Sequence, residues 1–305
     1  MPAADRDSER ARGRLLAADA GDIAIVAAAA LAVIALVVLM LVVPRASSRP
    51  PSDAHFRPGL IISDAAFYNP DSMTRSQVQH FLQTRSCVSA DGSPCLADYR
   101  QDTPDEPTQY AHCAAYHGRA GERASTIIVK VAHACRISPK VLLVLLQKEQ
   151  SLLTHPSASG YQRATGYACP DTAACDARYF GFFNQVYNAA WQFREYTVGG
   201  RSWRYHVGSV PIQFHPDTTC GSSTVDIRNQ ATANLYNYTP YQPSPETLKH
   251  PDTATGCSTF GNLNFWRLYK DWFGSPLAEL VPPQYDACLN LVDGRRCFPD
   301  PVTGL

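Results

Sequence analysis

Apolar residues between Ser138 and Thr154 recur at intervals of three, four and seven, which is typical of a helix with one face in a core. Ser138 suits the N-cap, and Pro139 suits the first turn, where its missing backbone N–H would have no partner anyway. Glu149 lies on the apolar stripe, seven residues after Leu142. Desolvation favours the protonated form of a carboxyl in such a place, as a general acid requires. The alternative is a surface glutamate near a helix end.

The same spacing predicts further helices, and shorter apolar runs predict a small hairpin. Residues 87–123 and 156–180 are rich in glycine, proline and cysteine, which favours loops. We therefore expect a mainly α fold that carries one small hairpin, an α+β variant of a helical domain. The expected helices are 73–83, 124–134, 184–197, 226–236 and 263–273, and the expected strands are 203–207 and 210–214.

An uninterrupted apolar run covers residues 23–43 and is long enough to cross a bilayer as a helix. Four arginines precede the run and two follow it closely, so the positive-inside bias favours a cytoplasmic N-terminus. We expect an uncleaved signal anchor in the cell membrane, single-pass, with a cleaved signal peptide as the alternative. The expected organisation is a cytoplasmic N-terminus (1–22), a transmembrane helix (23–43), a Pro/Ser-rich linker (44–58), a folded extracytoplasmic domain (59–276) and a Pro-rich tail (277–305).

All ten cysteines follow the apolar run, and an even number of cysteines in an exported segment indicates disulfides. Zinc binding is disfavoured because no Cys-x-x-Cys pair occurs. The sequence leaves the connectivity open, and short loops make neighbouring pairs the simplest arrangement. These pairs are Cys87 with Cys95, Cys113 with Cys135, Cys169 with Cys175, Cys220 with Cys257, and Cys288 with Cys297.

Charge and motifs disfavour several other classes of function. The 27 basic and 27 acidic residues balance, so nothing indicates a nucleic-acid partner. No Gly-x-Ser-x-Gly motif is present, and a Cys-His nucleophile does not fit an even set of paired cysteines. His206 and His215 lie among aromatic residues, where ordinary hydrogen bonds are the simpler role. We expect no metal and no cofactor.

A helix that carries one carboxyl, followed by a loop and a segment rich in aromatic and amide side chains, suits cleavage of a glycosidic bond. An acid must protonate the bridging oxygen, while amides and aromatic faces hold the sugars. The segment from Tyr179 to Gln185, Tyr-Phe-Gly-Phe-Phe-Asn-Gln, has this composition.

These residues resemble the lysozyme-like superfamily, in particular goose-type lysozymes and soluble lytic transglycosylases. Residues 147–151 (Gln-Lys-Glu-Gln-Ser) are similar to the glutamate motif, 158–160 to a compressed loop motif, and 181–185 to a diverged Gly-Leu-Met-Gln turn. Residues 229–241 are similar to the tyrosine-bearing helix end that faces the glutamate. The wider resemblance, over about residues 60–276, is to exported actinobacterial proteins with lysozyme-like cores and little assigned function. Ser151 lies two residues after the glutamate, whereas in the transglycosylase motif the serine comes next.

The resemblance implies that Glu149 is the general acid/base, and that Asn184 or Gln185 lines a sugar groove. Ser151, Tyr179, Tyr238 and Tyr241 are the further candidates for substrate binding. Asp171 and Asp176 are candidates for a second carboxylate, although either could cap the turn between Cys169 and Cys175.

The expected function is cleavage of peptidoglycan glycan strands outside the cell membrane, as a lytic transglycosylase or a muramidase. A single-glutamate mechanism, in which the sugar's own 6-hydroxyl closes an anhydro ring, is preferred to hydrolysis because no compelling second carboxylate is found. The alternatives are a non-catalytic module for cell-wall binding or adhesion on the same fold, and a structural subunit of an envelope complex.

Overall fold

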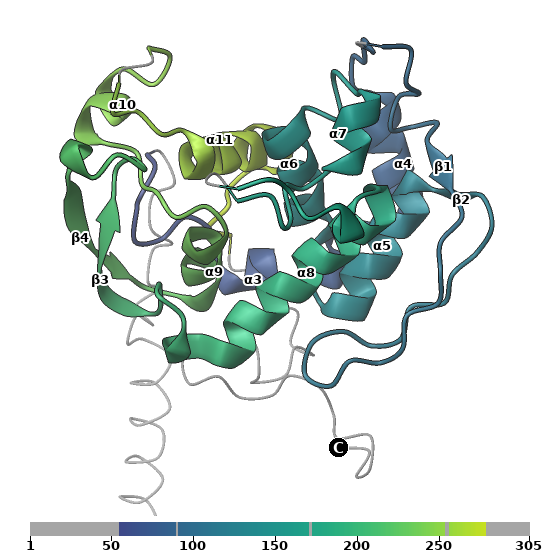
Figure 1. Cartoon of the computed structure of the whole chain (residues 1–305), viewed down its shortest axis with the longest axis horizontal. Helices are drawn as coiled ribbons and strands as arrows, with labels where there is room; N and C mark the ends of the chain where they lie inside the picture. Colours follow the sequence, from purple (N-terminus) through teal and green to yellow (C-terminus); the bar gives the residue numbers. More distant parts are fainter. Residues whose placement is uncertain (1–54, 90, 171–172, 254–255, 279–305) are drawn as a thin grey trace, which may run out of the picture. The chain divides into compact units, whose positions relative to one another are not determined.

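The computed structural model describes residues 55–278 except 90, 171–172 and 254–255, and this part of the chain is mainly helical with two small sheets (Figure 1). The α-helices are α3 (Asp64–Phe67), α4 (Arg75–Gln83), α5 (Ala124–Cys135), α6 (Pro139–Gln150), α7 (Ala158–Gln162), α8 (Phe182–Gly199), α9 (Gln230–Tyr238), α10 (Pro245–Lys249) and α11 (Gly261–Phe273). The strands are β1 (Arg100–Gln101), β2 (Glu122–Arg123), β3 (Gly208–Gln213) and β4 (Ser222–Ile227), and short 3-10 turns include η1 (Pro70–Ser72) and η2 (Ala177–Tyr179).

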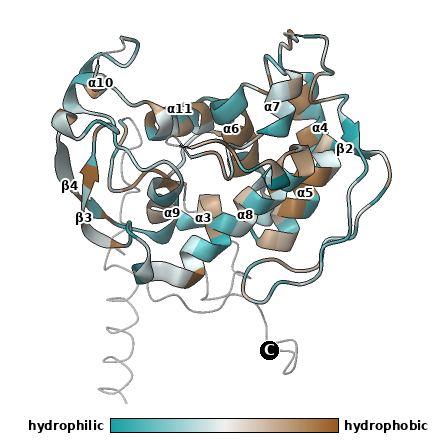
Figure 2. Cartoon of the chain, in the orientation of Figure 1, coloured by the Kyte–Doolittle hydropathy of each residue, from teal (hydrophilic) through white to brown (hydrophobic). Residues whose placement is uncertain are grey.

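Helix α6 lies at the centre of the core. Every residue from Val141 to Leu146 is buried, so the middle of this helix is covered on all sides. It packs against α5 and α11, and α5 in turn packs against α4 and α8. Figure 2 shows the apolar residues gathered on α5 and α6. The apolar stripe that predicted this helix is thus part of a broader buried surface.

The start of α6 is as predicted, but the helix ends earlier than the apolar pattern does. The Ser138 side chain accepts from the backbone N–H of Lys140 at 3.2 Å, and Pro139 occupies the first turn. Ser151 adopts a left-handed conformation (φ 52°), which terminates the helix after Gln150. Glu149 therefore lies in the last turn.

The prediction of strands at 203–207 and 210–214 is wrong in its first half. β3 pairs antiparallel with β4, from Gly208 opposite Ile227 to Gln213 opposite Ser222. Residue Tyr205 instead binds α9: its N–H donates to Asn237 Oδ1 (3.1 Å), and its carbonyl accepts from Asn237 Nδ2 (2.7 Å). This side-chain pairing replaces the expected strand. The helix predicted at 226–236 accordingly begins at Gln230, because the preceding residues belong to β4 and the N-cap.

Two short helices lie where loops, or no regular element, were expected. α7 follows Ser157, whose side chain accepts from the Gly160 N–H at 3.0 Å, and α10 follows Ser244, which accepts from the Thr247 N–H at 3.1 Å. The predicted loop motif at 158–160 is therefore the first turn of α7.

Four disulfides are present in the described part of the chain, and all four were predicted. They join Cys87 to Cys95, Cys113 to Cys135, Cys169 to Cys175 and Cys220 to Cys257. The predicted pair of Cys288 and Cys297 lies outside the described residues.

The two ends of the described part meet. The Ser63 N–H donates to the Pro276 carbonyl at 2.9 Å, and the Ser63 hydroxyl donates to the Ala278 carbonyl at 3.1 Å. Among residues 55–278 no helix is both long and apolar enough to span a membrane. The apolar run 23–43 lies outside the described residues, so the anchor stays a prediction.

Candidate functional site

Glu149 opens on a cavity of about 460 Å³ at one end of α6. The other walls come from the loop after α7, from the C-terminal end of α9 and from the start of α11. The described residues that line it are Lys148, Glu149, Gln150, Gly166, Cys169, Tyr238, Thr239, Pro240, Tyr241, Gly261 and Asn264. Glu149 is the one carboxylate among these lining residues.

The neighbouring Lys148 forms an ion pair with Glu149. The Lys148 ammonium contacts Glu149 Oε1 and also donates to Thr239 Oγ1 at 3.1 Å. The lysine side chain is 7% exposed and that of Glu149 is 23% exposed, so the pair is partly shielded from water. Lys148 thereby links the last turn of α6 to the end of α9 and fixes one oxygen of the carboxylate.

Gly166 lies directly against the other carboxylate oxygen. A Cβ atom at position 166 would stand 3.2 Å from Glu149 Oε2, and Gly166 has φ +71°. A side chain at this position would therefore meet both backbone strain and the carboxylate. Glycine lets the loop come this close to Glu149.

Gln185, on α8, holds this loop in place. Its Oε1 accepts from the N–H groups of Thr165 (3.2 Å) and Tyr167 (3.1 Å), and its Nε2 donates to the carbonyls of Tyr167 (3.0 Å) and Tyr179 (2.9 Å). The residue is fully buried. Gln185 thus acts from inside the protein, by positioning the loop, and its amide is not among the groups that line the cavity.

Asn262 has a similar place on the opposite wall. This buried residue of α11 donates through Nδ2 to the carbonyls of Thr239 (2.8 Å) and Tyr241 (3.0 Å). Both walls of the cavity are therefore held by buried amides.

Tyr238 lines both the cavity at Glu149 and a second one. Its hydroxyl donates to the Thr165 carbonyl at 2.8 Å, and burial, followed by the charge of Glu149, raises the pKa of the phenol well above its ordinary value. The second cavity measures about 400 Å³ and shares Gly166, Cys169 and Tyr238 with the first. Its remaining lining residues are Tyr167, Ala168, Pro170, Gln192 and Tyr196. The two cavities are therefore adjacent and together offer aromatic and amide groups on both sides of Tyr238.

The structure brings together Glu149, Tyr238 and Tyr241, whereas the predicted Ser151, Tyr179, Asn184 and Gln185 do not line the cavity. Ser151 is an exposed helix cap, and Asn184 donates to the Phe180 carbonyl at 2.9 Å, one turn back on its own segment. Tyr179 packs edge-on against Tyr167, with ring centroids 4.9 Å apart, and so supports the second cavity from behind its lining.

Of the two predicted partner carboxylates, the structure describes Asp176, which is engaged elsewhere. Asp176 caps η2 and pairs with Arg178 at 2.6 Å, and these bonds lower the pKa of its carboxyl. Asp171 lies outside the described residues. In the described ranges no three His, Cys, Asp or Glu side chains group as a metal site would require.

The sequence did not single out Lys148, Gly166 or Thr239 as site residues. Adjacent residues on a helix point in different directions, so nothing in the pattern predicted that Lys148 would reach Glu149. Gly166 carried a weak signal, as an isolated glycine in a loop.

Fold and site together define a mainly helical, disulfide-linked domain with a glutamate-bearing cavity at the end of its central helix. A model of the family described as LasA, N-terminal domain, matches residues 60–284. The chain belongs to this family. No curated protein and no solved structure gives a significant match to the chain. The resemblance to lysozyme-like enzymes stays a prediction.

Proposed function

We propose that this domain acts on bacterial cell walls and cuts the glycan strand of peptidoglycan with Glu149 as its single acid/base. The observation that carries the proposal is one carboxylate in an open cavity whose other lining residues include two tyrosines, the amide side chains of Gln150 and Asn264, and Lys148. Such walls suit a sugar chain, which offers hydroxyls and apolar ring faces. The family match supports action on the cell wall, because LasA belongs to the peptidoglycan-degrading staphylolytic proteases.

The proposed reaction uses the same carboxyl twice. Protonated Glu149 gives its proton to the bridging oxygen while the bond from that oxygen to the anomeric carbon breaks. The 6-hydroxyl oxygen of the same sugar then bonds to the anomeric carbon, and its proton passes to the Glu149 carboxylate. Atoms and charge balance, and no second carboxylate is needed.

The remaining groups position the chain and the acid. Gly166 and Lys148 fix the carboxyl from two sides, and Tyr238 and Tyr241 form walls against which sugar rings can lie. The second cavity extends the surface past Tyr238, so we propose that one strand occupies both.

One observation favours a second candidate, a wall-binding module without turnover. The ion pair with Lys148 gives Glu149 a partner of opposite charge, and a carboxylate held in this way can accept hydrogen bonds from sugar hydroxyls without transferring protons.

The test is to incubate the full-length chain with purified peptidoglycan and to measure both soluble muropeptides and the bound fraction. We expect Glu149→Gln to abolish release while binding is kept. The matched control is Glu246→Gln, which changes an exposed glutamate on α10 and should release muropeptides like the wild type. Binding without release by the wild type would favour the second candidate, and neither binding nor release would reject both.

We also propose that the domain works outside the cytoplasm. Four disulfides favour an oxidising compartment. Residues 23–43 would provide the membrane anchor.

A further inference from the structure

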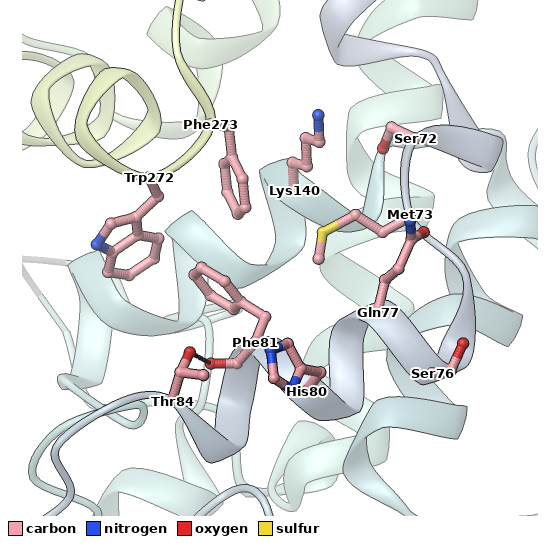
Figure 3. A pocket seen from close by; sticks show the side chains of 10 residues that line it. All are labelled: Ser72, Met73, Ser76, Gln77, His80, Phe81, Thr84, Lys140, Trp272 and Phe273. Atoms are coloured by element: carbon pink, nitrogen blue, oxygen red, sulfur yellow. Dashed lines mark hydrogen bonds between the residues drawn. The ribbon is translucent and has the colours of Figure 1, made fainter.

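A pocket of about 540 Å³ lies between α4, the start of α6 and the end of α11. Three aromatic rings form one side of it: Phe81 lies 5.4 Å from Trp272 and 5.1 Å from Phe273, measured between ring centroids. Figure 3 shows these rings close together, with Lys140 between Phe273 and Met73. The floor of the pocket is therefore apolar and aromatic, with a cation beside it.

Most polar groups on the rim already have partners within the protein. The Ser72 hydroxyl bonds Ser138 (2.8 Å), Gln77 Oε1 accepts from the Thr74 N–H (2.8 Å), and the Thr84 hydroxyl donates to the Phe81 carbonyl (2.8 Å). A ligand could bind these groups only by breaking a hydrogen bond that already exists within the protein.

Three cationic or basic side chains around the rings are different, because the described residues place no carboxylate in contact with any of them. The Lys140 ammonium lies 5.4 Å from the Phe273 ring centroid, and the Arg85 guanidinium lies 4.5 Å from that of Phe81. Arg85 Nε is buried without a hydrogen-bond partner, and the His80 ring faces the pocket. The nearby acid Asp71 is turned toward His133, at 3.6 Å.

Burial gives Lys140 a reason to bind an anion. The side chain is half-buried, and desolvation lowers the pKa of its amine. An anionic partner would offset that cost, and an aromatic or aliphatic body on the same ligand would cover the rings.

From this arrangement we propose that the pocket binds a small amphiphilic carboxylate, with its apolar body against Phe81, Trp272 and Phe273 and its carboxylate on Lys140. This site is separate from the one at Glu149. Lys140 is in the first turn of α6 and Glu149 in the last, which places them about 13 Å apart along the helix. The proposal does not rest on the peptidoglycan function.

The test compares 3-phenylpropionate with its neutral amide, 3-phenylpropionamide, by isothermal titration calorimetry on the full-length chain. We expect the acid to bind roughly tenfold more tightly than the amide, as for one charge-assisted hydrogen bond. Lys140→Gln should remove this difference by weakening the acid, and Trp272→Leu should weaken both compounds. The control Lys249→Gln changes an exposed lysine on α10 and should alter neither.

Circular dichroism of each variant separates loss of binding from loss of fold. Equal affinity for acid and amide, or an unchanged acid affinity in a folded Lys140→Gln variant, would overturn the proposal.

Discussion

Gly166 and Glu149 lie close together at the cavity: a Cβ atom at position 166 would stand 3.2 Å from Glu149 Oε2. Because the loop that carries Gly166 is held by Gln185 from the interior, the carboxylate rests on a fixed surface. The position of the acid therefore depends on α8 as well as on α6.

Gly166→Ala should disturb the acid itself. Alanine at a positive φ costs about 1 kcal/mol of stability, and its methyl group would push the carboxylate aside. We expect roughly ten- to hundredfold slower release of muropeptides, since small displacements of a catalytic group have effects of this size. Gly121→Ala is the matched control, because Gly121 has φ +59° and nothing within 4 Å of its Cβ position. It should lose similar stability but keep its activity, and equal activity losses would contradict the interpretation.

Replacement of Gln185 should loosen the loop. Gln185→Leu leaves the N–H groups of Thr165 and Tyr167 without their acceptor, which we expect to cost about 3 kcal/mol of unfolding free energy. Urea denaturation measures this loss, and limited proteolysis should show cleavage within residues 165–179. Asn188→Ala, on the same helix, removes a single bond to the Asn184 carbonyl and should cost about 1 kcal/mol at most. If the two variants behave alike, the special role of Gln185 is refuted.

The disulfides should separate stability from activity. Cys220 and Cys257 close a loop with a sequence separation of 37, so their joint replacement by alanine should cost about 4 kcal/mol. Joint replacement of Cys169 and Cys175, whose sequence separation is 6, should cost about 2 kcal/mol of unfolding free energy. Cys169 lines both cavities, however, so the second double variant should lose more activity per folded molecule. The double variant with the smaller loss of stability should therefore have the larger loss of activity. Denaturation curves and release assays on the folded fractions check this order.

Asp64 should make the stability depend on pH. Desolvation raises the pKa of this carboxyl to about 6, from 3.8, although it accepts hydrogen bonds from backbone groups at the start of α9. The folded state then holds the proton of Asp64 more tightly than the unfolded state, so the contribution of this residue to stability is greatest below about pH 4 and is lost as the pH rises through about 6. The loss should reach about 3 kcal/mol. Asp64→Asn keeps an acceptor oxygen and should flatten this slope, and parallel pH profiles of the two proteins in urea would refute the assignment.

Much of the helical framework could be predicted because capping and periodicity are local. Ser138 and Pro139 mark the start of α6, and the same Ser-Pro signal at Ser244 marks the start of α10, which apolar periodicity alone does not predict. The end of α6 had no such mark, since Ser151 is not a residue that usually adopts a left-handed conformation.

The site was predicted in part, for a physical reason that differs between residues. Glu149 stood out because it interrupts an apolar stripe, whereas Lys148 acquires its role through Thr239, ninety-one residues away in sequence. Gln185 lay in the right segment, but whether an amide faces a cavity or the interior is decided by the loop that folds over it. Likewise, the Tyr205 N–H donates to the Asn237 side chain, and this hydrogen bond takes the place of the predicted strand pairing.

The bond between Ser63 and Pro276 joins the beginning and the end of the described part at one place. A mechanical force applied to the chain before residue 63 and after residue 276 would therefore act on this hydrogen bond before it acts on the helices around α6. A circular permutant could join the two ends of the described part through a short linker and have its new termini elsewhere, for example in the exposed turn at Gly92. The cavity at Glu149 should survive both manipulations, because none of its walls is formed by these ends.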